Sequence, residues 1–246
     1  MSNNSKNKQS SLTLVSGFWV IPNKHDTKYF EWFERTLQID CPYVFFGNEE
    51  SINIVKKYRK DLPTHYILLE IKDFYTYKFY NDIKTHPLHC PSKELNLIWN
   101  EKIFLIKRAM ELNIYDSEFY GWIDAGICIY RDENMKPSKK AFPNKEKLMA
   151  LPKNKLIFAS SDCETFMPQF ANNLYYYHYI SGSTYILHKS FIDTFLGIYK
   201  SYLDFYLPQG NWMHTDQVLL TYIYTQSPEI FYKFANGYGN ILPLLE

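Results

Sequence analysis

Residues 118–127 read Glu-Phe-Tyr-Gly-Trp-Ile-Asp-Ala-Gly-Ile, an apolar run with one carboxylate, Asp124, near its end. Such a run is typical of a buried central strand that ends at Asp124. In an open α/β sheet, ligands bind at this carboxyl edge. Asp-x-Gly is also common turn chemistry, but the bulky neighbours Phe119 and Trp122 favour the strand. An aspartate among such residues needs a partner to stay charged, and a metal ion or a set of donors is the natural one.

Strand and helix patterns alternate around this run. Strands are predicted at residues 11–19, with a core ending at Gly17, and at 41–46, 66–71, 155–160 and 181–187. Helices are predicted at residues 27–37, 49–58, 94–113, 189–205 and 216–225, and the tail at 231–246 shows no helical pattern. The 94–113 helix is expected to bury Leu97, Phe104, Leu105, Ala109 and Leu112. The early strand and helix order predicts a parallel sheet with right-handed crossovers.

The 246 residues contain no repeat and no linker, so residues 11–246 are predicted to form one domain after a disordered polar tail at 1–10. The 27 Lys+Arg nearly balance the 26 Asp+Glu, which gives no support to a nucleic-acid partner or an anionic membrane. No apolar run approaches the roughly 20 residues that a membrane span requires. The cysteines are expected to be reduced core thiols because they lack paired spacing; they are Cys41, Cys90, Cys128 and Cys163.

Several enzyme classes lack their sequence marks. The chain has no Gly-x-Gly-x-x-Gly after the first strand, no phosphate loop, no Gly-x-Ser-x-Gly elbow and no His-Glu-x-x-His. The cluster His86-Pro-Leu-His89-Cys90 has no second Cys/His pair nearby, so it predicts a loop or lid rather than a zinc site.

Three segments remain: the helix around Asn100 to Arg108, the strand end at Asp124, and the turn His214-Thr-Asp-Gln217 before a late helix. Together they resemble nucleotide-sugar glycosyltransferases of the GT-A fold. The chain is most similar to the HtrL/YibB-type family of bacterial and viral glycosyltransferase-like proteins, through Trp99-Asn-Glu-Lys-Ile-Phe104 and Phe119-Tyr-Gly-Trp-Ile-Asp-Ala-Gly126. The likeness runs from about Ser11 to Phe231. It implies a single-domain α/β fold, GT-A-like (Rossmann-like), with a mixed, mostly parallel sheet flanked by helices.

The resemblance also implies roles for particular residues. Donor-binding residues would be Asp124, Lys102, Asn100, Trp122, Gly126, Gly17 and Gly182, with Lys102 on the diphosphate or ribose. Catalytic residues would be Asp216, Gln217 and Asp162, and Asn240 is a weaker candidate for the same region. Asp216 has an ordinary alternative, since an acid in the first turn of a helix complements the helix dipole.

Cleavage of a sugar–phosphate bond builds negative charge on a nucleoside diphosphate, which a divalent cation or basic groups must stabilise. Mn²⁺ or Mg²⁺ would be held by Asp124 and donor phosphates. The sequence departs from the common Asp-x-Asp pattern because residue 126 is glycine. Either the metal is dispensable or a second ligand comes from elsewhere, with His214, Asp162, Asp216 and Asn240 as the candidates.

The expected function is therefore transfer of a sugar from a nucleotide-sugar donor, with a UDP-sugar favoured, to a hydroxyl group of a glycan-type acceptor. The expected location is the cytoplasm of a bacterium or of a virus-infected host cell. A non-catalytic nucleotide- or glycan-binding protein that retains the fold is the alternative, because Asp124 lacks a second aspartate beside it. Fold resemblance alone does not separate the two.

Overall fold

The computed structural model describes residues 10–21, 25, 27–161, 165–167, 177–209 and 215–246. Strands within these residues are β1 (Leu12–Gly17), β2 (Tyr43–Gly47), β3 (Thr64–Leu68), β4 (Phe119–Ile123), β5 (Leu156–Ser160), β6 (Ile180–His188) and β7 (Phe231–Ala235). Helices are α1 (Lys28–Thr36), α2 (Glu49–Arg59), α3 (Lys93–Leu112), α4 (Lys145–Met149), α6 (Lys189–Tyr206), α7 (Asp216–Gln226) and α8 (Ile241–Leu245). Short 3₁₀ helices are η1 (Ile71–Asp73), η2 (Tyr75–Phe79), η3 (Cys128–Tyr130), η4 (Leu207–Gln209) and η5 (Pro228–Ile230).

The described strands form one sheet in the order β3-β2-β1-β4-β6-β5-β7. Within it β6 runs against its neighbours β4 and β5, and the other pairs are parallel. The prediction of a mixed, mostly parallel sheet is confirmed. Because β6 is reversed, its first residues lie beside the carboxyl end of β4, where the Asp124 N–H donates to the Ser183 carbonyl at 2.9 Å.

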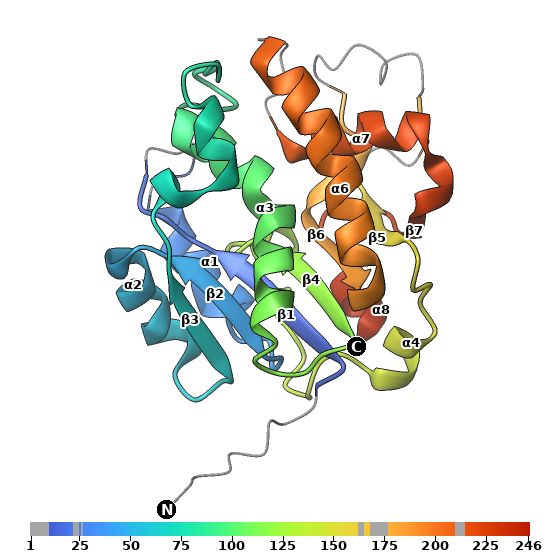
Figure 1. Ribbon diagram of the computed structural model, residues 1–246. Helices are drawn as coiled ribbons and strands as arrows, with labels where there is room; N and C mark the ends of the chain where they lie inside the picture. The colour runs from blue at the N-terminus through green and yellow to red at the C-terminus, as the bar shows by residue number, and fades with distance from the viewer. Residues whose placement is uncertain (1–9, 22–24, 26, 162–164, 168–176, 210–214) are drawn as a thin grey trace, which may run out of the picture.

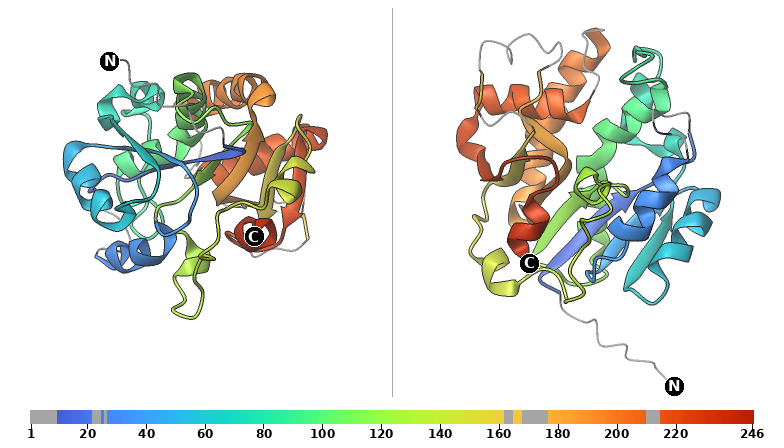
Figure 2. Two further views of the ribbon diagram at one scale, coloured as in Figure 1. Left: turned by 90° about the horizontal axis from the view of Figure 1, so that it is seen from below. Right: turned by 180° about the vertical axis from the view of Figure 1, so that it is seen from behind.

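Helices cover both faces of the sheet. Figure 1 shows α3 and α6 in front of the strands, and the rear view in Figure 2 shows α2 and α8 on the opposite face. Alternate residues of β4 point to opposite faces of the sheet. Tyr120 and Trp122 belong to the hydrophobic cluster under α3 and α6, and Phe119 and Ile123 belong to the cluster on the opposite face. β4 is therefore buried on both sides, as expected for a central strand.

Some element predictions were wrong. The tail at 231–246 contains β7 and α8, since Ile241 and Leu245 are buried in the core. Leu112 was expected on the buried face of its helix but is 43% exposed. The strand predicted at 66–71 is Thr64–Leu68, and η1 follows it.

Other predictions meet the limits of the described residues. Residues 1–9 of the predicted tail lie outside them, and so does Cys163. Cys41 and Cys90 are buried, Cys128 is partly buried, and none of the three forms a disulfide, as the spacing predicted. None of the described helices is both long enough and apolar enough to cross a membrane.

Arg59, the last residue of α2, is fully buried and forms hydrogen bonds with the segments just before β2 and β3. Its guanidinium lies 3.8 Å from the centroid of the Tyr43 ring, and its Nε donates to Thr64 Oγ1. Its other nitrogens donate to the carbonyls of Leu37, Ile39, Cys41 and Pro63. These carbonyls precede β2 and β3, so one buried side chain links the segments that lead into two neighbouring strands.

Replacing Arg59 with methionine should lower the free energy of unfolding by at least about 3 kcal/mol, because several hydrogen bonds from a buried charged group are lost at once. Lys57→Met on the exposed side of the same helix is the matched control and should change stability by less than about 0.5 kcal/mol. Urea unfolding followed by circular dichroism measures both. Equal stability of the two variants would show that the Arg59 network contributes nothing.

Candidate active site

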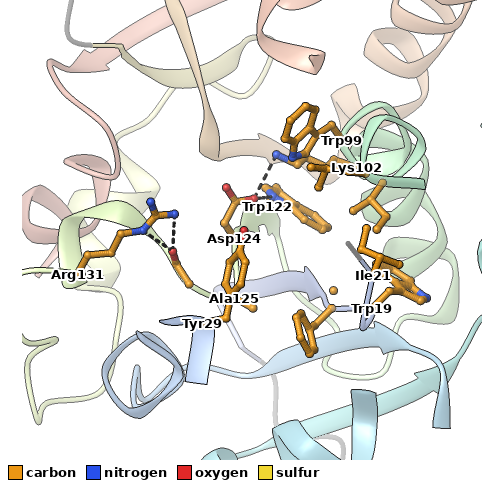
Figure 3. Close-up of a pocket in the computed structure, with 14 residues that line it drawn as sticks. Trp19, Ile21, Tyr29, Trp99, Lys102, Trp122, Asp124, Ala125 and Arg131 are labelled. Carbon is orange, nitrogen blue, oxygen red and sulfur yellow. Dashed lines mark hydrogen bonds and ion pairs between the residues drawn. The ribbon is translucent and has the colours of Figure 1, made fainter. Parts of the chain in front are cut away.

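Asp124 follows β4 directly, at the edge where β1 and β4 end and β6 begins. Its Oδ1 accepts a hydrogen bond from Trp122 Nε1 at 2.7 Å and lies 3.1 Å from Lys102 Nζ. The side chain of Asp124 is 36% exposed, so the carboxylate is held by two donors yet still meets solvent. Figure 3 shows these contacts in the pocket.

Lys102 reaches the site from α3, and only 3% of its side chain is exposed. Its Nζ donates to the Gly182 carbonyl at 2.8 Å and lies 3.1 Å from Asp124 and 3.2 Å from Asp216. Burial alone lowers the pKa of this lysine, but the two carboxylates more than offset the effect and raise it. The Gly182 contact is a hydrogen bond and the two carboxylate contacts are ion pairs, so protein oxygens surround the ammonium.

Asp216 is the first residue of α7 and is 2% exposed. Thr215 caps this helix, because its Oγ1 accepts from the Val218 N–H at 3.3 Å. Burial raises the pKa of Asp216 to about 6 and Asp124 adds to the rise, although Lys102 opposes it. Asp216 Oδ2 lies 3.2 Å from Lys102 Nζ, and the two atoms form an ion pair but not a hydrogen bond. The Asp124–Lys102–Asp216 triple thus joins β4, α3 and α7.

Gly182 lets α7 approach β6. A Cβ atom there would lie 2.7 Å from Gln217 Cγ and 2.8 Å from both carboxylate oxygens of Asp216, distances too short for any side chain. The Gly182 N–H also donates to Gln217 Oε1 at 2.8 Å. The absence of a side chain at 182 is therefore what brings Asp216 to Lys102.

Two pockets adjoin at Asp124. The β1 pocket has a cavity volume of about 80 Å³, and its lining includes Gly17, Trp19, Ile21, Trp122 and Gly126. The α7 pocket has a cavity volume of about 310 Å³, and its lining includes His178, Gly182, Ser183, Asp216, Gln217 and Tyr238. Both pockets share Tyr29, Trp99, Lys102, Asp124 and Arg131. The volume of the α7 pocket falls in the range of small-ligand sites, whereas the volume of the β1 pocket is below that range.

The structure brings most of the predicted site residues together. Those lining a pocket are Gly17, Lys102, Trp122, Asp124, Gly126, Gly182, Asp216 and Gln217. Asp162 and His214 lie outside the described residues. Asn240 lines neither pocket and precedes α8.

Asn100 does not fit its predicted contact with the donor. It is fully buried and lines neither pocket. Its Nδ2 donates to the carbonyl and side-chain oxygens of Asn96 at 3.0 and 2.9 Å, and its Oδ1 accepts from the Tyr199 hydroxyl at 3.3 Å. Asn100 therefore holds α3 against α6, and its neighbour Lys102 is the residue that reaches the site.

Sequence reasoning did not identify Arg131 as a site residue. Both Nε and Nη2 of Arg131 donate to the Gly126 carbonyl at 3.1 Å, and the guanidinium lies 4.0 Å from the centroid of the Trp32 ring. The sequence signal for Arg131 was a single arginine shortly after the Asp124 strand, and one basic residue in a loop is weak evidence for a binding site.

The described residues alone do not supply a full set of protein ligands for a divalent metal ion. Nowhere in the described part of the chain do three His, Cys, Asp or Glu side chains gather with metal-ligand geometry. The space between Asp124 and Asp216, where a metal could bridge two carboxylates, is filled by the Lys102 ammonium. The predicted pairing of Asp124 with His214 stays a prediction, since His214 is outside the described residues.

Replacing Lys102 should leave the buried Asp216 carboxylate unpaired and so destabilise the fold. Lys102→Met should lower the free energy of unfolding at pH 8 by about 3–5 kcal/mol, as for other broken buried ion pairs. The loss should shrink towards pH 4. The fold raises the pKa of Asp216 above its ordinary value of 3.8, so at pH 4 the folded variant holds Asp216 in its neutral form, and burying a neutral carboxyl group without Lys102 costs little stability. Urea unfolding at both pH values measures this.

Two comparison variants sharpen the result. Lys102→Met combined with Asp216→Asn should recover much of the lost stability, because no unpaired charge remains buried. Lys107→Met, on the same helix but in a surface ion pair, should cost less than about 1 kcal/mol. A Lys102→Met loss that is equal at pH 4 and pH 8 would contradict the role given to Asp216.

Known proteins resemble this chain in fold and in sequence. The structure of mouse xyloside xylosyltransferase 1, apo form, matches 90% of this chain and 84% of that chain with a TM-score of 0.53 and 12% identity. Protein HtrL of Escherichia coli (strain K12) is 25% identical over 115 residues, which are 41% of this chain and only 40% of that protein. The family described as "Bacterial protein of unknown function (HtrL_YibB)" matches residues 67–241. The chain has a GT-A-like fold and belongs to the HtrL_YibB family.

Proposed function

We propose that this protein is a glycosyltransferase that moves a sugar from a nucleotide-sugar donor to a hydroxyl group of a glycan-type acceptor. The observation that carries the proposal is the Asp124–Lys102–Asp216 triple, which lies where the β1 pocket and the α7 pocket meet. A structure with the same fold belongs to a xylosyltransferase, which supports the reaction class by analogy.

The donor nucleotide is assigned to the β1 pocket. Trp19 and Trp99 give this pocket flat apolar surfaces of the kind that stack on a nucleobase. Gly17 and Gly126 also line this pocket, and aromatic rings occupy the space that side chains would need there: Trp19 beside Gly17, and Tyr29 and Trp32 beside Gly126. A UDP-sugar remains the proposed donor, and Asp124 acts on its ribose–phosphate portion.

The transferred sugar and the acceptor are assigned to the α7 pocket. Asp216 and Gln217 line it and come from the start of one helix. In an inverting reaction Asp216 takes the proton of the acceptor hydroxyl, and in a retaining reaction it orients and stabilises the sugar. Gln217 supplies a hydrogen bond through its amide, whose Oε1 is already oriented by Gly182.

Asp124→Asn should fold normally and lose at least about tenfold in donor turnover, a loss of roughly 1.4 kcal/mol or more. The assay incubates the protein with a panel of nucleotide sugars and Mn²⁺ and measures release of free nucleoside diphosphate. Asp61→Asn, an exposed carboxylate outside both pockets, is the control and should match wild type.

The same panel separates an enzyme from a non-catalytic binding protein. The second function is an alternative because residue 126 is glycine and not the second aspartate of an Asp-x-Asp pattern. Thermal-shift screening detects a bound nucleotide whether or not turnover occurs, because ligand binding stabilises the native state. Binding without any release of diphosphate, with or without an acceptor, would select the binding protein.

A pH profile tests Asp216. The active form is the carboxylate, so protonation below its pKa of about 6 should make kcat/KM fall as the pH is lowered. Asp216→Asn should lower transfer by about 100-fold or more and abolish this acid limb, while nucleotide affinity stays nearly unchanged. Transfer at the wild-type rate with a slightly lower melting temperature would leave Asp216 as a helix-start acid worth about 0.3–1 kcal/mol.

A further inference from the structure

Among the described residues that line the two pockets, Lys102 and Arg131 carry permanent positive charge. Lys102 is compensated by two carboxylates, donates to the Gly182 carbonyl, and has only 3% of its side chain exposed. It can orient Asp124 and Asp216, but these two carboxylates already balance its positive charge. A donor diphosphate in the shared part of the pockets must therefore find its positive charge elsewhere.

Arg131 supplies such a charge. Within the described part of the chain no Asp or Glu lies in ion-pair range of its guanidinium, and Nη1 has no hydrogen-bond partner. The same side chain lines both pockets beside Asp124. Figure 3 shows Arg131 on the far side of Asp124 from Lys102. A partly buried and uncompensated cation of this kind attracts an anion strongly.

The guanidinium is also held in place before any ligand arrives. Two of its nitrogens donate to the Gly126 carbonyl and its plane lies over Trp32. The backbone around it is fixed by Arg35, whose Nε donates to the Tyr130 carbonyl at 2.6 Å and whose Nη2 donates to the Arg131 carbonyl at 3.1 Å. Little ordering is needed when an anion binds, which favours affinity.

We propose that Arg131 binds the donor diphosphate and that this binding requires no divalent metal ion. This inference rests on the proposed function. In the transfer step the bond between the sugar anomeric carbon and the diphosphate oxygen breaks, and its electron pair leaves on the diphosphate. The acceptor oxygen forms the new bond to that carbon, and its proton passes to Asp216 or to the departing diphosphate. Arg131 stabilises the charge that develops on the leaving group.

The test compares the binding of UDP and of uridine by isothermal titration calorimetry, in EDTA and in Mn²⁺. Wild type should bind UDP in EDTA about as tightly as in Mn²⁺. Arg131→Gln should weaken UDP at least about tenfold while uridine binds as before, because a lost phosphate contact leaves the nucleoside contacts intact. Arg131→Lys should bind UDP with an affinity between those of wild type and Arg131→Gln, since lysine keeps the positive charge but not the paired N–H donors of the guanidinium. Arg108→Gln, an exposed arginine on α3 outside both pockets, should match wild type.

Each other outcome has a defined meaning. Loss of UDP binding in EDTA, with recovery in Mn²⁺, would overturn the inference and leave the proposed function standing. Equal weakening of UDP and uridine in Arg131→Gln would show that Arg131 only supports the fold of the pocket, and would also overturn it. If wild type binds neither UDP nor any other nucleoside diphosphate in either buffer, the proposed function fails and the inference fails with it.

Discussion

One buried ammonium holds the site together. Lys102 Nζ contacts Asp124 after β4, Asp216 at the start of α7 and the Gly182 carbonyl of β6, so four elements meet at a single atom. Taking such charges out of water costs several kcal/mol for each ion. The arrangement is stable only while all the partners are present, which makes it a constraint on geometry more than a source of stability.

The position of β6 makes this contact possible. If β6 ran parallel to β4, its first residues would lie at the opposite edge of the sheet, and Gly182 could not meet Asp124. The reversed strand brings residues from the second half of the chain to the edge that β1 and β4 define. The β1 pocket is built mainly from the first half of the chain and the α7 pocket mainly from the second, with the triple between them.

The sequence predicted those parts whose pattern is repeated or strongly apolar. The Asp124 strand, the long helix of α3 and the helix that starts at Asp216 were all found, because burial imposes a period on them. Within α3 the same logic failed for individual residues: Asn100, Glu101 and Lys102 are buried although polar. Glu101 accepts from the Tyr75 and Thr76 N–H groups, partners that cannot be inferred from the helix alone. Arg131 was missed for the same reason, since its position beside Asp124 depends on the path of the loop.

The close approach at Gly182 limits how the family can vary. The start of α7 fills the space that even a methyl group would need, so a larger residue at 182 could appear only with a retreat of residues 216 and 217. Such a retreat would separate Asp216 from Lys102 and leave the Asp216 carboxylate without its ion-pair partner, while Lys102 would keep Asp124. Positions 182, 216 and 217 are therefore expected to change together or not at all, and a relative with a side chain at 182 should have lost the acid at 216 as well.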